Sequence, residues 1–204
     1  MNEKITNQIA EMKKQTIGVE VEMNSITREK AARNAAKFFG TTAYYAAGEY
    51  GYKAWACKDP QGRVWKFMRD SSISGPDDEK CELVTPILTY ADMETLQELI
   101  RQLRHAGAKS DATRGCGVHI HIGAKGHTPQ TMRNLANIMA SHEDLIAKAL
   151  DLDHRRMSRY CRTVDPEFLK QVNKKKPKTM SQLADIWYGS QGCNYGRSQH
   201  YNDS

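Results

Sequence analysis

The sequence has no apolar run that approaches the length of a membrane span and no apolar segment near its amino terminus. A helix that crosses a bilayer needs about 20 consecutive, mainly apolar residues, whereas only 39% of the 204 residues are hydrophobic. Residues 1–15 mix acidic and basic side chains in a polar, helical pattern, which is unlike a secretion signal. These absences predict a cytoplasmic protein without a membrane partner.

Cysteine pairs with metal-binding or redox spacing are also absent. The five cysteines form no CxxC pair, and an odd number without a secretion signal argues for reduced thiols instead of a disulfide framework. The chain likewise has no internal repeat and no shift in composition that would mark a domain boundary. A length of 204 residues suits one hydrophobic core, so we predict a single domain over residues 1–204.

Basic residues outnumber acidic ones, 30 to 24, and give a formal net charge of +6. Much of the excess lies in residues 155–162 and 170–178, where a nucleic acid or a nucleotide triphosphate is a candidate anionic partner. The lysine-rich second segment offers little aromatic surface on which bases could stack, so a solvated loop is the simpler interpretation. A nucleic-acid-binding module is therefore only a third-ranked hypothesis, and nucleic acid is not the expected partner.

Apolar periodicity predicts an α+β fold. Period-two alternation, or an apolar run bounded by turn residues, favours strands over 18–24, 52–57, 63–73, 81–88 and 115–123. The turn sequence Asp59-Pro60-Gln61-Gly62 predicts that the second and third of these form a hairpin. Helical spacing and capping residues predict helices over 27–39 and 89–107 and helices that start at Thr128, Asp165 and Thr179.

Two of the predicted strands carry paired metal-binding side chains on one face. Glu20 and Glu22 alternate with apolar residues, and so do His119 and His121. Carboxylates or imidazoles at such positions are costly to bury unless they meet a cation. The alternatives are the exposed face of a surface strand for the glutamates and hydrogen-bonded core residues for the histidines.

Glu82 supplies a third strand carboxylate. Its apolar neighbours Cys81 and Leu83 predict that it is buried and needs a partner. Three carboxylates with a histidine suit Mg²⁺ or Mn²⁺ better than zinc, because hard cations prefer oxygen ligands. Cys116 lies out of phase with His119 and His121 in a regular strand, which argues against a thiolate site there.

Two further groups are candidates for ligand binding. Asp70 and Ser71 lie where a predicted strand becomes a loop, although ordinary turn chemistry also explains them. Four arginines lie close together after the Thr128 helix, at positions 155, 156, 159 and 162. Guanidinium groups bind phosphate oxygens in pairs, so these arginines form either a phosphate clamp or a solvated helical face.

Five motifs, taken in order, resemble the amidoligase family of carboxylate-amine ligases, relatives of glutamine synthetase and glutamate-cysteine ligase. They are GVEVEMN (18–24), RDSSI (69–73), CELVTP (81–86), GCGVHIHIG (115–123) and SRYCR (158–162). The resemblance implies a curved, mainly antiparallel sheet, open or an incomplete barrel, with helices packed on one face and ATP and Mg²⁺ (or Mn²⁺) bound on the concave face. It also implies that a substrate carboxylate attacks the γ-phosphate of ATP and that an amine then displaces phosphate to form an amide.

The resemblance assigns a role to ten residues. As metal ligands it implies Glu20, Glu22, Glu82 and His119. As residues that bind the ATP cofactor it implies His121, Arg156 and Ser71. As catalytic residues it implies Arg159, Arg162 and Asp70.

One motif of the family is missing from the sequence. Members continue into a strand of the form T-x-E-F-R, which supplies a metal ligand and a phosphate-binding arginine, and residues up to Ser204 contain no such motif. We therefore expect a C-terminally truncated or split ligase domain, whose candidate partners are a separate C-terminal part or further copies in a homo-oligomer. The implied carboxylate and amine substrates are derived from peptides, proteins or the cell wall. The alternative is a degenerate ligase fold that binds nucleotide or a partner without turnover.

Overall fold

The structure is a computed structural model that describes residues 3–51, 53–152, 157 and 162–189. The chain divides into two compact units, Met1–Gly123 and Ala124–Ser204. The single domain expected from the sequence stays a prediction. Within the described ranges, none of the helices combines the length and apolar character that a bilayer crossing requires.

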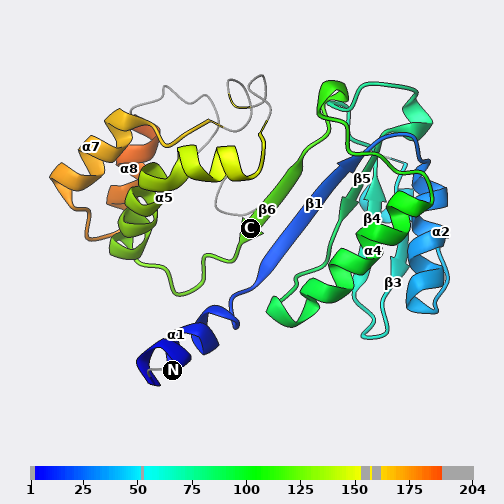
Figure 1. Cartoon of the computed structure of the whole chain (residues 1–204), viewed down its shortest axis with the longest axis horizontal. Coiled ribbons are helices and arrows are strands. Elements are labelled where there is room, and N and C mark those ends of the chain that lie inside the picture. Colours follow the sequence, from blue (N-terminus) through cyan, green and yellow to red (C-terminus); the bar gives the residue numbers. More distant parts are fainter. Residues whose placement is uncertain (1–2, 52, 153–156, 158–161, 190–204) are drawn as a thin grey trace. The chain divides into compact units, whose positions relative to one another are not determined.

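An open six-stranded antiparallel sheet forms the first unit and, with its helices, confirms the predicted α+β class (Figure 1). In spatial order its strands are β2 (Tyr44–Tyr45), β3 (Trp55–Lys58), β4 (Val64–Met68), β5 (Cys81–Val84), β1 (Ile17–Met23) and β6 (Val118–Ile122). The helices of this unit are α1 (Glu3–Met12), α2 (Arg28–Phe39), α3 (Ala47–Tyr50) and α4 (Met93–His105), with 3-10 turns at Asp77–Glu79, Tyr90–Asp92 and Ala112–Arg114. Strand β1 thus lies between two strands that come much later in the sequence.

Helices α2 and α4 pack on one face of this sheet (Figure 1). Their alanine and leucine side chains meet the apolar side chains that alternate along the strands. Val21, Leu83 and Phe67 lie side by side across β1, β5 and β4 in this layer, and all three are buried. Because successive strand residues point to opposite faces, their neighbours Glu22 and Glu82 lie on the face away from the two helices.

The predicted helix boundaries are set by the expected capping residues. The Thr27 side chain accepts a hydrogen bond from the backbone of the first turn of α2, and Gly40 ends this helix with a φ of 69°, a left-handed conformation that favours glycine. Thr89 and Asp92 form the predicted capping box. However, this capping box belongs to a 3-10 turn over Tyr90–Asp92, and the α-helix begins only at Met93.

Strand β5 is shorter than the apolar pattern predicts. The pattern favours a strand over 81–88, but the regular ladder ends at Val84. Pro86 has no N–H with which to extend it, and beyond this point an isolated bridge joins Leu88 to Ile17. The end of β5 therefore remains attached to β1 without forming a continuous strand.

Strand β4 also ends early, and this places the RDSSI motif (69–73) in a loop. The pattern predicts a strand over 63–73, whereas β4 ends at Met68. Asp70 follows in the loop, where its Oδ1 accepts a hydrogen bond of 2.6 Å from the backbone N–H of Ser72. Such a turn competes with strand pairing, which explains why the ladder stops here.

The second unit is helical in its described part. It contains α5 (Pro129–Ala149), α7 (Pro166–Lys175) and α8 (Met180–Gly189). The predicted starts are confirmed, because Thr128, Asp165 and Thr179 each accept a hydrogen bond from the first turn of the helix that follows. A small core holds these helices together and consists of Phe168, Val172, Leu183 and Ile186, with partly buried neighbours on α5.

An ion-pair network joins the β3–β4 hairpin to the start of α4. The carboxylate of Asp59 is buried and accepts hydrogen bonds from Arg63 Nε (2.8 Å) and Trp65 Nε1 (3.0 Å). Arg63 Nη2 also donates to Asp92 Oδ1 at 2.8 Å. The hydrogen bond from Arg63 is the largest cause that holds the pKa of Asp92 at about 2. The ionised form of Asp92 therefore stabilises the fold.

Asp92→Asn tests this network. At neutral pH we expect the free energy of unfolding to fall by about 1–2 kcal/mol, because a charge-assisted hydrogen bond and a helix cap are weakened. Since the pKa of Asp92 is lowered by folding, the wild-type advantage is present above about pH 4 and is lost as the pH falls towards about 2. Urea unfolding across this range measures both effects, with the exposed Asp78→Asn as control. Equal stability of wild type and Asp92→Asn at neutral pH would contradict the assignment.

Candidate functional site

The alternation along β1 places two carboxylates on the sheet face away from α2 and α4. Val19, Val21 and Met23 are buried beneath the helices, so Glu20 and Glu22 point to the other side. Register then sets Glu22 directly opposite Glu82 of β5, and Glu20 opposite His119 of β6. All four residues implied as metal ligands therefore share one face of three neighbouring strands.

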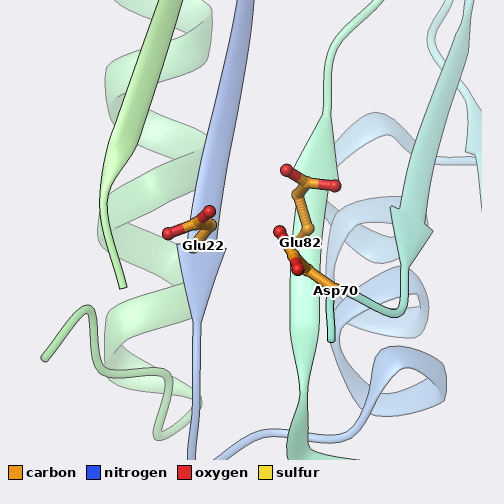
Figure 2. A group of neighbouring side chains, drawn as sticks. All are labelled: Glu22, Asp70 and Glu82. Atoms are coloured by element: carbon orange, nitrogen blue, oxygen red, sulfur yellow. The ribbon is translucent and has the colours of Figure 1, made fainter. Parts of the chain in front are cut away.

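Three carboxylates meet on this face and form what we call the acidic cluster, Glu22, Asp70 and Glu82. One oxygen from each lies within 4.8 Å of an oxygen from each of the others. Figure 2 shows that they come from three segments: Glu22 from β1, Glu82 from β5, and Asp70 from the loop that follows β4. The early end of β4 is what brings Asp70 to this place.

Glu22 is the most deeply buried member of the cluster. Only 4% of its surface is exposed, and its Oε2 has no hydrogen-bond partner among the described residues. Burial raises the pKa of Glu22, and the neighbouring charge of Asp70 raises it further, whereas His119 and the backbone of Gly117 act in the opposite direction. An unpartnered buried carboxylate oxygen is costly, and a bound cation would offset this cost.

Glu82 is held in a similar electrostatic environment. Burial is the largest cause that raises its pKa to about 7, and the charges of Glu20, Asp70 and Glu22 add to the shift. Lys66, on the neighbouring strand β4, lowers the pKa of Glu82 but does not cancel the shift. Near neutral pH the cluster therefore carries more negative charge than the side chains around it compensate.

The two histidines of β6 lie at the border of the acidic cluster. His119 Nε2 is 3.4 Å from Glu22 Oε1, and His121 Nε2 is 3.5 Å from Glu20 Oε1. Each imidazole is about half exposed, so a ligand can reach it from solvent. Glu20 lies outside the acidic cluster but contributes its charge to Glu82. The metal-binding roles of Glu20 and His119 stay predictions.

The donor set of the acidic cluster fits a hard divalent cation. All three groups offer carboxylate oxygens, which Mg²⁺ and Mn²⁺ prefer over sulfur or nitrogen ligands. The unpartnered Oε2 of Glu22 supplies a buried lone pair, and burial, followed by the neighbouring carboxylates, raises the pKa of Glu82. Glu22, Asp70 and Glu82 are thus the residues that could hold such an ion.

The remaining candidates for phosphate binding and catalysis lie outside the acidic cluster or outside the described residues. Ser71 is exposed in the loop that carries Asp70. Arg156 and Arg159 lie outside the described residues, and Arg162 is an exposed residue of the second unit. Their roles in binding phosphate or in catalysis stay predictions.

Sequence reasoning missed one residue of this face and left the role of another open. Lys66 alternates with the buried Trp65 and Phe67, and this period of two could have placed it on the polar face. The resemblance implies Asp70 as a catalytic residue at the substrate or metal edge of the site, and its position in the acidic cluster makes it a candidate metal ligand. Only the strand end after Met68, which is hard to predict from the sequence, could have indicated that Asp70 meets Glu22 and Glu82.

The raised pKa of Glu82 makes a prediction about cation binding. Since a proton competes with the metal for this carboxylate, we expect Mg²⁺ to raise the melting temperature more at about pH 8 than at about pH 6. Without Mg²⁺, stability changes with pH in the opposite direction. Because folding raises the pKa of Glu82, the contribution of this residue to stability declines as the pH rises from about 4 through 7. Thermal denaturation at both pH values, with and without MgCl₂, measures these trends.

Glu82→Gln is the control for this experiment. The variant has no titrating group at this position, so the difference between the two pH values should shrink markedly. A Mg²⁺-induced shift of the wild type that is identical at both pH values would show that Glu82 takes no part in cation binding.

Comparison with known proteins identifies one family. A family model described as "Putative amidoligase enzyme" matches residues 13–204. Comparison with curated proteins and with solved structures finds no match. The matched range includes both strands that carry the paired glutamates and histidines, and all three residues of the acidic cluster. Because the match extends over most of the chain, the protein belongs to the amidoligase family.

Proposed function

We propose that the protein is an ATP- and Mg²⁺-dependent carboxylate-amine ligase that forms an amide bond through an acyl phosphate. The observation that carries this proposal is the meeting of Glu22, Asp70 and Glu82 on the sheet face that is not covered by α2 and α4. Membership of the amidoligase family supports the ligase class. The chemistry of the acidic cluster supports the use of a divalent cation.

Charge repulsion is the main barrier that such an enzyme must lower. ATP and a carboxylate nucleophile are both anionic and repel each other. Glu22, Asp70 and Glu82 would hold Mg²⁺, which when bound neutralises phosphate charge and stabilises the transferring phosphoryl group. Lys66 adds a fixed positive charge beside this cluster. It is suited to attract the carboxylate substrate to the same face of the sheet.

The histidines of β6 are suited to contact the phosphates and the cation. His119 and His121 each lie next to a glutamate of β1, and both are accessible. A carboxylate that accepts from Nε2–H orients the ring, and Nδ1 then donates to a phosphate only in the doubly protonated ring. We therefore assign His121 to a phosphate contact, whereas His119, next to the cation-binding carboxylates, keeps its predicted role as a metal ligand.

The proposed ligase reaction has two steps, and the bonds formed and broken in each step balance. A substrate carboxylate oxygen bonds to the γ-phosphorus while the bond from phosphorus to the bridging oxygen breaks, which releases ADP. The amine nitrogen then bonds to the acyl carbon, and the carbon–oxygen bond to phosphate breaks. The products are an amide, ADP, inorganic phosphate and the proton lost by the amine. Neither step needs an oxidant or a reductant.

Release of ADP tests the proposal directly. The full chain is incubated with ATP, Mg²⁺ and a panel of carboxylic acids and amines, including peptides. We expect ADP release that requires an acid, an amine and the cation together and that stops when the cation is chelated. Binding of Mg²⁺-ATP without acid-dependent turnover would instead indicate a degenerate ligase fold that only binds nucleotide.

A further inference from the structure

A hollow of about 590 Å³ lies on the same sheet face as the acidic cluster, at the end formed by β2, β3 and β4. Tyr44 of β2 is paired with Ala56, which is in turn paired with Lys66, so these side chains share the face of Glu82. The volume falls in the range of small-molecule sites, about 300–1,000 Å³. The hollow is large enough for an amino acid.

A cluster of small, buried side chains packs against the residues that line this hollow. Ala46, Ala54 and Ala56 are buried and pack with Tyr44 and Tyr50 in a separate apolar cluster. Of these three, Ala56 is the strand residue, at a position where larger β-branched or aromatic residues are usual. The rings of Tyr44 and Tyr50 line the hollow and provide its apolar walls.

Two exposed side chains of opposite charge line the hollow. They are Glu49 of α3 and Lys58 of β3, and among the described residues no ion pair joins them. Burial raises the pKa of Tyr44 and of Tyr50, and the charge of Glu49 raises both further. Both phenols therefore stay neutral near pH 7: Tyr44 can donate a hydrogen bond to a ligand, and Tyr50 is hydrogen-bonded to Glu49. A carboxylate, an ammonium group and two phenols together match a ligand that carries both charges.

Lys66 lies between this hollow and the acidic cluster. Its Nζ is 5.0 Å from the ring centroid of Tyr50, and its charge also acts on Glu82. Along β4, Val64 lines the hollow and Met68 is paired with Glu82. Four residues of strand at about 3.3 Å each separate the two places by roughly 13 Å.

We propose that this hollow binds the zwitterionic amino acid end of the substrate, with its ammonium group at Glu49 and its carboxylate at Lys58. The remainder of the substrate extends along the sheet past Lys66 towards the acidic cluster. Binding energy from such a remote group can position the reacting end. The role as a substrate subsite rests on the proposed ligase function, whereas the binding itself can be measured without turnover.

Titration of the isotope-labelled full chain by NMR tests the binding. L-Alanine carries both charges, L-alaninamide only the ammonium, and propionate only the carboxylate. We expect L-alanine to bind about tenfold more tightly than either single-charge analogue, because one charge contact is lost in each. L-Alanyl-L-alanine, in which the charges are further apart, distinguishes a free amino acid from a peptide. Equal affinity for L-alanine and its two analogues, or no binding of L-alanine, would overturn the proposal.

Two variants locate the site. Glu49→Gln should lower the affinity for L-alanine to about that of propionate, and Lys58→Met should lower it to about that of L-alaninamide. The matched controls Glu94→Gln on α4 and Lys37→Met on α2 change exposed residues of the helices on the other face and should leave binding unchanged. Unaltered L-alanine affinity in both site variants would refute the assignment.

The same variants separate this inference from the ligase proposal. Both should retain the Mg²⁺-induced rise in melting temperature, since neither belongs to the acidic cluster. If ligase turnover is found, Glu49→Gln should raise the KM of the zwitterionic substrate with little change in kcat. If L-alanine binds with the expected charge dependence but no substrate is turned over, the hollow is confirmed and only the ligase function fails.

Discussion

Glu22→Gln (E22Q) is expected to lower ATP-dependent ADP release by at least about 100-fold, since it removes one charged ligand where electrostatic stabilisation is the main catalytic effect. The substitution keeps the shape of a side chain that is 4% exposed and replaces the buried, unpartnered oxygen by an amide. We also expect most of the Mg²⁺-induced rise in melting temperature to be lost. The stability of the metal-free protein should be retained or should increase, because a buried charge with a raised pKa has been removed.

The matched control is Glu94→Gln, which makes the same change at an exposed position of α4. It should leave ADP release and the effect of Mg²⁺ unaltered. Wild-type turnover by Glu22→Gln together with a full Mg²⁺ effect would exclude the acidic cluster as the cation site. A variant that loses turnover but melts well below the metal-free wild type would indicate a packing role for Glu22 instead.

Leu83→Ala is expected to reduce the free energy of unfolding by about 2–5 kcal/mol, which is a large part of the stability of a typical domain. Leu83 is fully buried on β5, where it lies between Val21 of β1 and Phe67 of β4. The substitution removes apolar area and leaves a cavity beneath α2 and α4. Since Leu83 is next to Glu82, we also expect weaker Mg²⁺ binding in the folded fraction.

Chemical denaturation monitored by fluorescence and by circular dichroism measures the loss of stability. Ile87→Ala is the aliphatic control, because this side chain is 73% exposed and its truncation should cost less than about 0.5 kcal/mol. If the two variants are equally stable, Leu83 does not lie in the core that the sheet and the two helices share.

Local patterns in the sequence predict much of this fold. The alternation of Glu20 and Glu22 with valines defines β1, and Thr27 and Gly40 bound α2, because these signals act over a few neighbouring residues. The same is true of the hairpin turn that ends at Gly62. Elements such as β2 and α3 could not be predicted, since two and four residues are too few to show a period.

The composition of the site was harder to predict than its existence. Strand parity places Glu22 and Glu82 on polar faces, but only the pairing of β1 with β5 sets the two carboxylates opposite each other. Asp70 joins them because β4 stops at Met68. Lys66 acts on the cluster through the register of β4 with β5. Strand order and register depend on packing across the whole sheet, and a single sequence does not encode them in neighbouring residues.

The three carboxylates of the acidic cluster come from β1, β5 and the loop after β4, which has a consequence during synthesis of the protein. A nascent chain that has not yet paired β1 with β5 contains each carboxylate but no place where they converge. Contacts between segments so far apart in sequence form late, because long loops must close first. If the cluster holds the cation as proposed, a chain in which β1 and β5 are still unpaired cannot turn over nucleotide, and metal binding would report that this pairing has formed.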